Sequence, residues 1–374
     1  MLSKEELKRY DRHILLSEIG ISGQEKLKNA KVLVIGAGGL GCPILQYLTS
    51  AGIGTIGIVD FDVVDISNLQ RQILYTVDDI GKLKVDCAIN KLSRQNPFVN
   101  FSAYNTQLSN QNALEIIKKY DIVIDGTDNF PTRYLVNDAC VILNKPLVYG
   151  SINKFEGQVS VFNYSDFKNK KRPTYRCLFP EPPSAADVPN CSEAGVLGVL
   201  PGIVGSFQAN EAIKIITGIG NVLLGKLLMI NALSMQFYTI AFERNETVAN
   251  SITLQQFKNN DYELFCNGSY PKLNNEITVM ELHQLLINDR NSIQLVDVRE
   301  VGEQPLVEIL KEINIPLNII IKNADQINLS KKVVVFCKSG VRSSAAIQKL
   351  QTEKGLDNLF NLKGGVMEWL KNYK

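Results

Sequence analysis

The sequence predicts an α/β protein in which a doubly wound, mainly parallel sheet is followed by a second, smaller α/β unit. In the first half of the chain, short apolar runs typical of buried parallel strands alternate with helical stretches. The first of these runs, 32–35, leads into a glycine-rich loop at 36–41. Near the other end, the apolar run 333–336 leads directly into a cysteine-containing loop at 337–342.

The first unit is expected to cover residues 1–245. Its strands are predicted at 32–35, 56–60, 121–125, 146–150 and 157–162. Its helices are predicted at 43–51, 82–95, 132–143 and 200–216. The stretch 164–190 is rich in Lys, Pro, Ser and Asp and is expected to be a long surface loop. The alternation of strands and helices predicts a parallel sheet with helices on both faces.

The second unit is expected at 276–374, after a polar linker at 246–275 that lacks strong periodicity. Its helices are predicted at 279–286, 343–354 and 366–370, and its strands at 293–298 and 332–336.

The composition is that of a soluble globular protein. The 374 residues suffice for two or three domains, and a net charge of +2 gives no electrostatic reason to bind nucleic acid or an acidic membrane. The N-terminal segment is polar, and no apolar run approaches the roughly 20 residues that span a bilayer. Seven cysteines without a framework spacing fit a reducing compartment, so a cytoplasmic protein is expected.

The glycine loop has the pattern Gly36-x-Gly38-x-x-Gly41 between a strand and a helix. This arrangement lets the backbone approach phosphates at a helix N-terminus, whose dipole favours anions. Asp60 follows about 20 residues later, where an acid can bind ribose hydroxyls. The fingerprint predicts a Rossmann-like nucleotide site and, taken alone, leaves an NAD-dependent dehydrogenase open.

The residues around this loop favour ATP over NAD. A dehydrogenase needs an acid or base beside the hydride, and the two histidines, His13 and His283, are not in such a place. Arg71, Lys84 and Asp128 instead provide two cations and a carboxylate that can converge on a triphosphate. This set suits nucleotidyl transfer, in which cations and magnesium stabilise charge on the α-phosphate.

From about Lys8 to Phe242 the chain resembles the ubiquitin-activating-type adenylyltransferases, the MoeB/ThiF family. The resemblance is carried, besides the glycine loop, by the stretches 9–13, 59–62, 67–72, 81–84, 125–129, 191–196 and 205–206. Members of this family adenylate the C-terminal glycine of a small ubiquitin-fold sulfur carrier. The resemblance therefore implies ATP and Mg²⁺ as cofactors, and a carrier with a Gly-Gly tail as partner.

The resemblance also implies roles for single residues. Asp60 would hold the ribose, Arg71 and Lys84 the phosphates, and Asp128 the magnesium ion. Arg12 would reach the phosphates of a neighbouring subunit, which implies a homodimer; the alternative is a solvated charge on a helix. The nucleotide site would further include Gly36, Gly38, Gly39, Gly41, Asp62 and Asn68. Asp62 is equally compatible with a turn residue at a strand end.

The cysteines of this chain compare with that family in two ways. Many members bind a structural zinc through two Cys-x-x-Cys pairs, but here the first pair retains only Cys177, and the second, near 244–250, has no cysteine. A tetrahedral zinc needs four cysteine or histidine ligands, so we expect no zinc site. Cys191 corresponds to a loop cysteine that bonds covalently to the carrier in some members; an ordinary loop cysteine is equally compatible.

The second loop runs from Cys337 to Arg342, between a predicted strand and a predicted helix. Backbone N–H groups in such a loop stabilise a thiolate, and Arg342 adds a cation. The alternatives are a buried cysteine on a tight turn and a phosphatase loop, but four intervening residues instead of five make a ring that suits a persulfide better than a phosphate.

From about Glu276 to Lys374 the chain resembles a rhodanese domain. The resemblance is carried by the Cys337–Arg342 loop and by 295–300, 315–317 and 362–369. The stretch between Glu300 and Ile315 departs from the family's usual His-Ile-Pro-Gly-Ala pattern. Asp297 and Arg299 are expected to be structural.

The two resemblances together imply one reaction sequence. The first unit would adenylate the carrier's terminal carboxylate, and a persulfide on Cys337, loaded from thiosulfate or another persulfide, would supply sulfur directly or through Cys191, giving a thiocarboxylate. The motifs favour a carrier of the molybdopterin-synthase type, with the thiamine-thiazole carrier as alternative. Activation of a ubiquitin-like modifier through a Cys191 thioester, and a Rossmann-type oxidoreductase, remain open alternatives.

Overall fold

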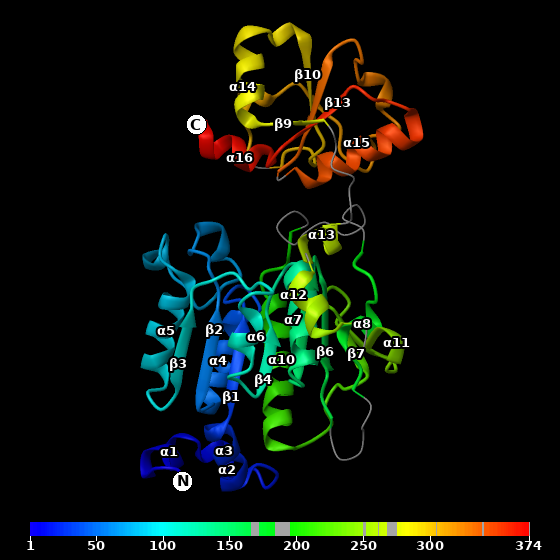
Figure 1. Cartoon of the computed structure of the whole chain (residues 1–374). Helices are drawn as coiled ribbons and strands as arrows, with labels where there is room; N and C mark the ends of the chain where they lie inside the picture. The colour runs from blue at the N-terminus through cyan, green and yellow to red at the C-terminus, as the bar shows by residue number, and fades with distance from the viewer. Residues whose placement is uncertain are drawn as a thin grey trace. The chain divides into compact units, whose positions relative to one another are not determined.

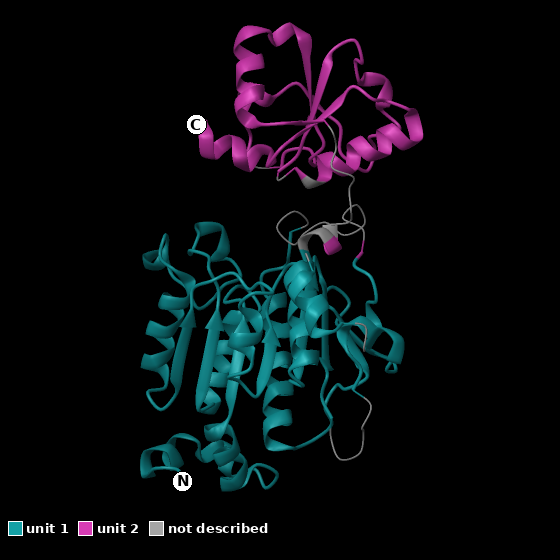
Figure 2. Cartoon of the chain, viewed as in Figure 1, with its two compact units in different colours: residues 1–182, 190–262 teal, residues 183–189, 263–374 magenta. Residues whose placement is uncertain are grey.

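The computed structural model describes residues 1–165, 172–183, 195–249, 252–260, 262–267, 275–303, 305–338 and 340–373. Within these residues the chain forms two compact units, divided near Tyr262 (Figure 2). No helix of the described parts is long and apolar enough to cross a membrane.

Unit 1 is built on an eight-stranded sheet with the order β3-β2-β1-β4-β5-β6-β7-β8 (Figure 1). The first five strands in this order pair in parallel, and β6, β7 and β8 add an antiparallel extension. The strands are β1 (Lys31–Ile35), β2 (Thr55–Val59), β3 (Asn100–Tyr104), β4 (Ile122–Asp125), β5 (Leu147–Asn153), β6 (Glu156–Phe162), β7 (Lys226–Asn231) and β8 (Gln236–Ala241). The predicted doubly wound, mainly parallel sheet is confirmed.

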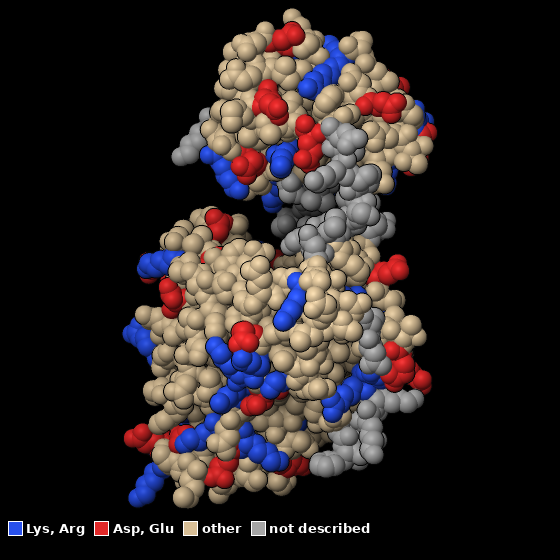
Figure 3. All heavy atoms as spheres, viewed as in Figure 1, with Lys and Arg blue, Asp and Glu red and all other residues tan. Residues whose placement is uncertain are grey.

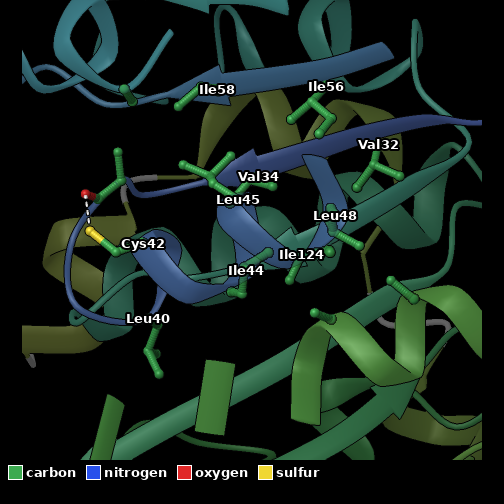
Figure 4. Close-up of a cluster of buried hydrophobic side chains, with 14 of the residues drawn as sticks. Val32, Val34, Leu40, Cys42, Ile44, Leu45, Leu48, Ile56, Ile58 and Ile124 are labelled. Atoms are coloured by element: carbon green, nitrogen blue, oxygen red, sulfur yellow. Dashed lines mark hydrogen bonds between the residues drawn. The ribbon is translucent and has the colours of Figure 1, made fainter. Parts of the chain in front are cut away.

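The helices of unit 1 either precede the first strand or follow later strands in sequence. They are α1 (Lys4–Arg9), α2 (Asp11–Ile14), α3 (Gly20–Asn29), α4 (Gly41–Ala51), α5 (Lys84–Gln95), α6 (Ala113–Ile117), α7 (Phe130–Ile142), α8 (Tyr175–Leu178) and α10 (Leu200–Thr217). The core beside α4 is formed by Val32 and Val34 of β1, Ile56 and Ile58 of β2 and the apolar face of α4 itself (Figure 4). Every strand residue named here is fully buried, as expected for central parallel strands.

The stretch expected to be a linker contains α11 (Glu246–Ala249), α12 (Leu254–Asn259) and α13 (Tyr262–Asn267). Phe257 of α12 is fully buried, and the hydroxyl of Tyr262 donates a 2.8 Å hydrogen bond to Asp138 on α7. Asp138 also accepts two hydrogen bonds from Arg176. The first part of this stretch is therefore packed against unit 1.

Unit 2 contains a five-stranded parallel sheet with the order β11-β10-β12-β13-β9. Its strands are β9 (Glu276–Ile277), β10 (Ile293–Asp297), β11 (Ile313–Asn314), β12 (Lys332–Phe336) and β13 (Leu359–Leu362), and its helices are α14 (Val279–Asn288), α15 (Val341–Lys354) and α16 (Gly365–Asn372). Apolar side chains pack on both faces of this sheet, in two clusters. The predicted smaller α/β unit is confirmed.

On the face of the two units drawn in Figure 3, basic and acidic side chains are interspersed, in keeping with the small net charge.

Candidate active site

A cavity of about 330 Å³ lies at the carboxyl ends of the central strands of unit 1. It is lined by residues that follow β1, β2, β3 and β4. In the sheet order, β1 and β4 are neighbours whose chains continue to opposite sides, which makes this the switch point of the fold. Ligands of open α/β sheets bind at such a point. The volume is within the range of small-molecule sites.

The glycine loop forms one wall of this cavity. Gly36 has a φ of +91°, and a Cβ there would lie 2.7 Å from the carbonyl oxygen of Gly126. A Cβ on Gly41, the first residue of α4, would lie only 2.0 Å from the carbonyl oxygen of Gly36. Gly38 and Gly39 line the cavity itself. The turn is therefore tight enough to require glycine, and it brings bare backbone to the cavity.

Cys42 lies just behind this loop and is fully buried, with its Sγ 3.6 Å from the Ala37 carbonyl oxygen (Figure 4). Burial raises the pKa of the Cys42 thiol to about 12. Cys42 is therefore a packing residue that stays protonated at neutral pH.

Asp60 lies at the end of β2, where its carboxylate accepts two backbone hydrogen bonds of 2.8 Å. One comes from Ala37 in the glycine loop and the other from Asp62. Burial raises the pKa of Asp60, and the nearby Lys84 opposes that shift. Because a carboxylate has about four acceptor positions, Asp60 can accept further hydrogen bonds from a ligand hydroxyl.

Two cations line the same cavity as the loop. Lys84 is 5% exposed and its Nζ lies 2.9 Å from Asp62 Oδ2. Arg71 is half-buried, and one of its terminal nitrogens donates a 3.0 Å hydrogen bond to the Ser67 carbonyl. Asp128, after β4, is exposed and lines the same cavity. The structure thus brings together the glycine loop, Asp60, Asp62, Arg71, Lys84 and Asp128.

Two predicted site residues lie elsewhere. Arg12 is exposed on α2 and Asn68 is half-buried on a 3-10 turn, and neither is among the described residues that line the cavity. Asn68 Oδ1 instead accepts a hydrogen bond from the Asp65 backbone. Cys191 lies outside the described residues.

Arg133 is a buried cation that also lines the cavity and was not predicted from the sequence. Its Nε lies 3.3 Å from Asp125 Oδ2, and its guanidinium lies over the Tyr149 ring at 5.1 Å. Burial raises the pKa of Asp125, and the charge of Arg133 opposes that shift. The sequence signal available was an arginine eight residues after a strand-end acid, near the start of a helix, which is too common to single out.

The two stretches compared above with zinc-binding pairs do meet in the structure. Cys177 Sγ accepts hydrogen bonds from the backbone N–H groups of Thr174, at 3.3 Å, and Asn245, at 3.4 Å. Within the described residues, no group of three or more His, Cys, Asp or Glu side chains is placed to hold a metal. The absence of zinc stays a prediction.

The second predicted loop connects β12 to α15 and places Cys337 in the interior of unit 2. The Cys337 residue has no exposed surface, and its Sγ accepts a 3.1 Å hydrogen bond from the Gly340 backbone. Gly340 has a φ of +94°, which turns the loop into the helix. The backbone N–H groups of Val366 and Met367, at the start of α16, donate to the carbonyls of Cys337 and Lys338. The Cys337 loop is therefore fixed by one hydrogen bond within it, from Gly340 to the sulfur, and by two hydrogen bonds from the start of α16.

Arg342 does not act as an isolated charge beside this loop. Its two terminal nitrogens donate to the two carboxylate oxygens of Glu303, at 2.8 and 2.7 Å. Burial alone would raise the pKa of Glu303, but the Arg342 hydrogen bonds and charge lower it below its ordinary value. Arg299 is likewise paired with Asp297, at 2.7 Å. Glu303 lies in the stretch that departs from the usual rhodanese pattern.

Comparison with known proteins gives both units a family. Residues 10–250 match the ThiF family, and residues 278–372 match the rhodanese-like domain. The chain is 44% identical to the "Probable adenylyltransferase/sulfurtransferase MoeZ" of Mycobacterium tuberculosis, over 99% of this chain and 94% of that protein. It is 50% identical to the "Sulfur carrier protein adenylyltransferase" of Thermus thermophilus, over 71% of this chain and 98% of that protein.

Solved structures agree on the fold. The crystal structure of Escherichia coli MccB with ATP superposes with a TM-score of 0.56 at 24% identity, covering 66% of this chain and 75% of that one.

The family match and these relatives make unit 1 an adenylyltransferase, joined in the same chain to a sulfurtransferase-type domain. The chain belongs to the ThiF family and carries a C-terminal rhodanese-like domain. The resemblances stated from the sequence are thereby confirmed.

Proposed function

We propose that this enzyme adenylates the C-terminal glycine of a ubiquitin-fold sulfur carrier and then converts the activated carboxylate to a thiocarboxylate. The observation that carries the proposal is the convergence of the glycine loop, Arg71, Lys84 and Asp128 on one cavity, in a chain that also holds the Cys337 loop. The relative named for both adenylyl and sulfur transfer supports it, as does the relative named for adenylyl transfer to a sulfur carrier protein. We propose a carrier of the molybdopterin-synthase small-subunit type, and a cytoplasmic location.

In the adenylation step, the carrier's carboxylate oxygen attacks the α-phosphate of ATP, the bond between the α- and β-phosphates breaks, and pyrophosphate leaves. The glycine loop would place backbone N–H groups on the phosphates, and Asp60 would bind the ribose. Lys84 and Arg71 would stabilise the charge that develops in the transition state. The ion pair with Asp62 holds Lys84 in place until the phosphates of ATP replace the Asp62 carboxylate as its partner.

Asp128 would hold magnesium together with the nucleotide. Its exposed carboxylate in the cavity offers the hard oxygen ligand that Mg²⁺ prefers. Mg²⁺ is commonly bound by one or two carboxylates plus substrate phosphates, so a larger cluster of acids is not required. When bound, the ion neutralises phosphate charge as pyrophosphate leaves.

We propose a homodimer in which Arg12 contributes to the partner's site. Arg12 is exposed and outside the cavity of its own subunit, so it is available for contact with a second copy. We propose that Asn68 acts at the edge of the nucleotide site by positioning Arg71, because the Asn68 carbonyl accepts a hydrogen bond from the Arg71 backbone.

In the sulfur step, Cys337 first takes the outer sulfur of thiosulfate, releasing sulfite and forming a persulfide. The terminal sulfur then attacks the acyl adenylate, AMP leaves, and an acyl disulfide links the carrier to Cys337. A second thiol cleaves the S–S bond and releases the thiocarboxylate. If Cys191 is that thiol, a Cys191–Cys337 disulfide results, which an external dithiol must reduce.

ATP–pyrophosphate exchange in the presence of a candidate carrier tests the first step. We expect exchange to be lost in Asp128→Ala and retained in Cys337→Ala. The matched control is Asp78→Ala, because Asp78 is an exposed carboxylate outside the cavity. Exchange at the normal rate in Asp128→Ala would refute the site assignment.

Thiocarboxylate formation from thiosulfate, followed by mass spectrometry of the carrier, tests the second step. It should fail in Cys337→Ala, although exchange continues. Carriers of the molybdopterin and thiamine types, assayed side by side, distinguish the two pathways. A dithiothreitol-sensitive adduct at Cys191 that forms without Cys337 would favour activation of a ubiquitin-like modifier instead.

A further inference from the structure

Behind the Cys337 thiol lies a buried polar pair that the reaction scheme above does not use. Ser343, in the first turn of α15, places its Oγ 3.5 Å from Cys337 Sγ and 2.7 Å from Asn361 Oδ1. Ser343 is fully buried, and Asn361, on β13, is 5% exposed. Polar groups at such depth have a cost unless they are hydrogen-bonded, and these two groups are hydrogen-bonded to each other beside the thiol.

The hydroxyl of Ser343 carries one proton and cannot donate to both neighbours at once. If its proton points to the Asn361 oxygen, its own oxygen is left to accept from the Cys337 S–H. If its proton points to the sulfur, it stabilises a thiolate, and its oxygen then needs a donor. A carboxamide can supply either an acceptor or, after a half-turn, an N–H donor. Asn361 is therefore compatible with both protonation states of the sulfur.

We propose that Ser343 and Asn361 form a hydrogen-bond relay that positions a hydroxyl on the Cys337 sulfur in both its S–H and its anionic forms. Asn361 acts through Ser343 and is a positioning residue. The relay deepens the proposed sulfur transfer and rests on it for its function, but its geometry can be tested without any sulfur donor. The Gly340 N–H supplies the backbone partner of the same sulfur at 3.1 Å, so the relay adds the side-chain partner.

The relay differs from a purely structural pair in what each variant should do. Ser343→Ala removes the hydroxyl, whereas Ser343→Thr keeps it. Asn361→Asp is acceptor-only when ionised, so it holds the Ser343 proton away from the sulfur. Ser344→Ala is the matched control, because Ser344 is the next residue of the same helix and, among the described residues, has no hydrogen bond to the thiol.

The first measurement is the infrared S–H stretching band of the full-length protein, isolated by subtracting the spectrum of Cys337→Ala. We expect Ser343→Ala to move this band to the higher frequency of a free S–H, and Ser343→Thr and Ser344→Ala to leave it in place. An unmoved band in Ser343→Ala, in a protein with the wild-type melting temperature, would overturn the relay. The infrared measurement does not depend on the proposed function.

The second measurement is the rate at which thiosulfate adds one sulfur to Cys337, followed by intact-mass spectrometry. We expect about tenfold slower loading in Ser343→Ala, consistent with loss of one hydrogen bond to a charged group, and recovery to within about twofold in Ser343→Thr. Asn361→Asp should slow loading only while Ser343 is present, so the double variant should be no slower than Ser343→Ala. Multiplying effects in the double variant would overturn the relay, since Asn361 would then act directly. A wild-type protein that takes no sulfur contradicts the proposed function and leaves the infrared test standing.

Discussion

Replacing Gly41 by alanine should slow ATP–pyrophosphate exchange, because it distorts the buried turn of the glycine loop. The new Cβ would lie 2.0 Å from the Gly36 carbonyl oxygen, and an ordinary contact begins at 3.4 Å, so the two sides of the loop must separate by 1.4 Å (3.4 − 2.0). A misplacement of about 1 Å can cost roughly 100-fold in rate. Overpacking of this kind costs about 1–3 kcal/mol, which lowers the melting temperature of a unit of this size by roughly 2–12 °C.

The assay is ATP–pyrophosphate exchange at saturating carrier, with the melting temperature measured on the same samples. Gly41→Ala should lose about 100-fold in exchange. Gly202→Ala on α10 is the matched control, because a Cβ there meets nothing within 4 Å, and it should behave as wild type. Gly38→Ala separates folding from binding. Its Cβ would meet only the Gln72 amide, at an ordinary 3.6 Å, so stability should hold while the KM for ATP rises. Normal exchange in Gly41→Ala would refute the assignment of this loop to the phosphates.

Further predictions concern stability and metal content. Arg133→Met should lower the free energy of unfolding of unit 1 by about 3–5 kcal/mol, because it leaves the fully buried Asp125 without its cation; denaturant unfolding measures this, and Arg133→Met/Asp125→Asn should recover part of it. The Glu303–Arg342 pair should stabilise unit 2 at neutral pH, because the folded pKa of Glu303 lies below its ordinary 4.5. This contribution is complete above the ordinary value and is lost as the pH falls through the folded pKa, so Glu303→Gln should flatten the acid limb of thermal stability, and an unchanged acid limb would contradict the pairing. Elemental analysis of the purified protein should find no zinc, and one tightly held zinc per chain would show that ligands other than Cys177 complete a site.

The parallel strands of unit 1 could be predicted because burial on both faces leaves an apolar run in the sequence. Strand β3 was missed for the opposite reason: its residues are exposed or half-buried, and they include Asn100 and Ser102. Strand β8 was missed although Phe237, Tyr238 and Ile240 make it rich in strand-forming residues; each of its residues is exposed, so no alternation of polar and apolar residues marks it. Where a strand has no buried face, sequence periodicity carries no signal.

At the site, too, some features could be predicted from the sequence and others depend on tertiary packing. The convergence of Asp60 and Asp128 on the glycine loop could be predicted because the carboxyl ends of parallel strands meet at one edge of the sheet. The role of Arg133 could not, since its burial depends on how α7 packs over Asp125. The pairing of Arg342 with Glu303 joins residues 39 positions apart, with two strands between them, which no local pattern reveals.

The hydrogen bonds from Val366 and Met367 to the Cys337 loop can form only late in the synthesis of each chain. The ribosome makes the loop well before it makes the start of α16, so the loop carbonyls lack these partners until synthesis has passed residue 367. Strand β9 likewise lacks its partner at first, because its neighbour β13 is made more than 80 residues later. An interrupted chain could therefore hold a complete adenylation unit, yet it would present an unassembled thiol loop. Under the proposed function, such a truncated product would activate its substrate without delivering sulfur.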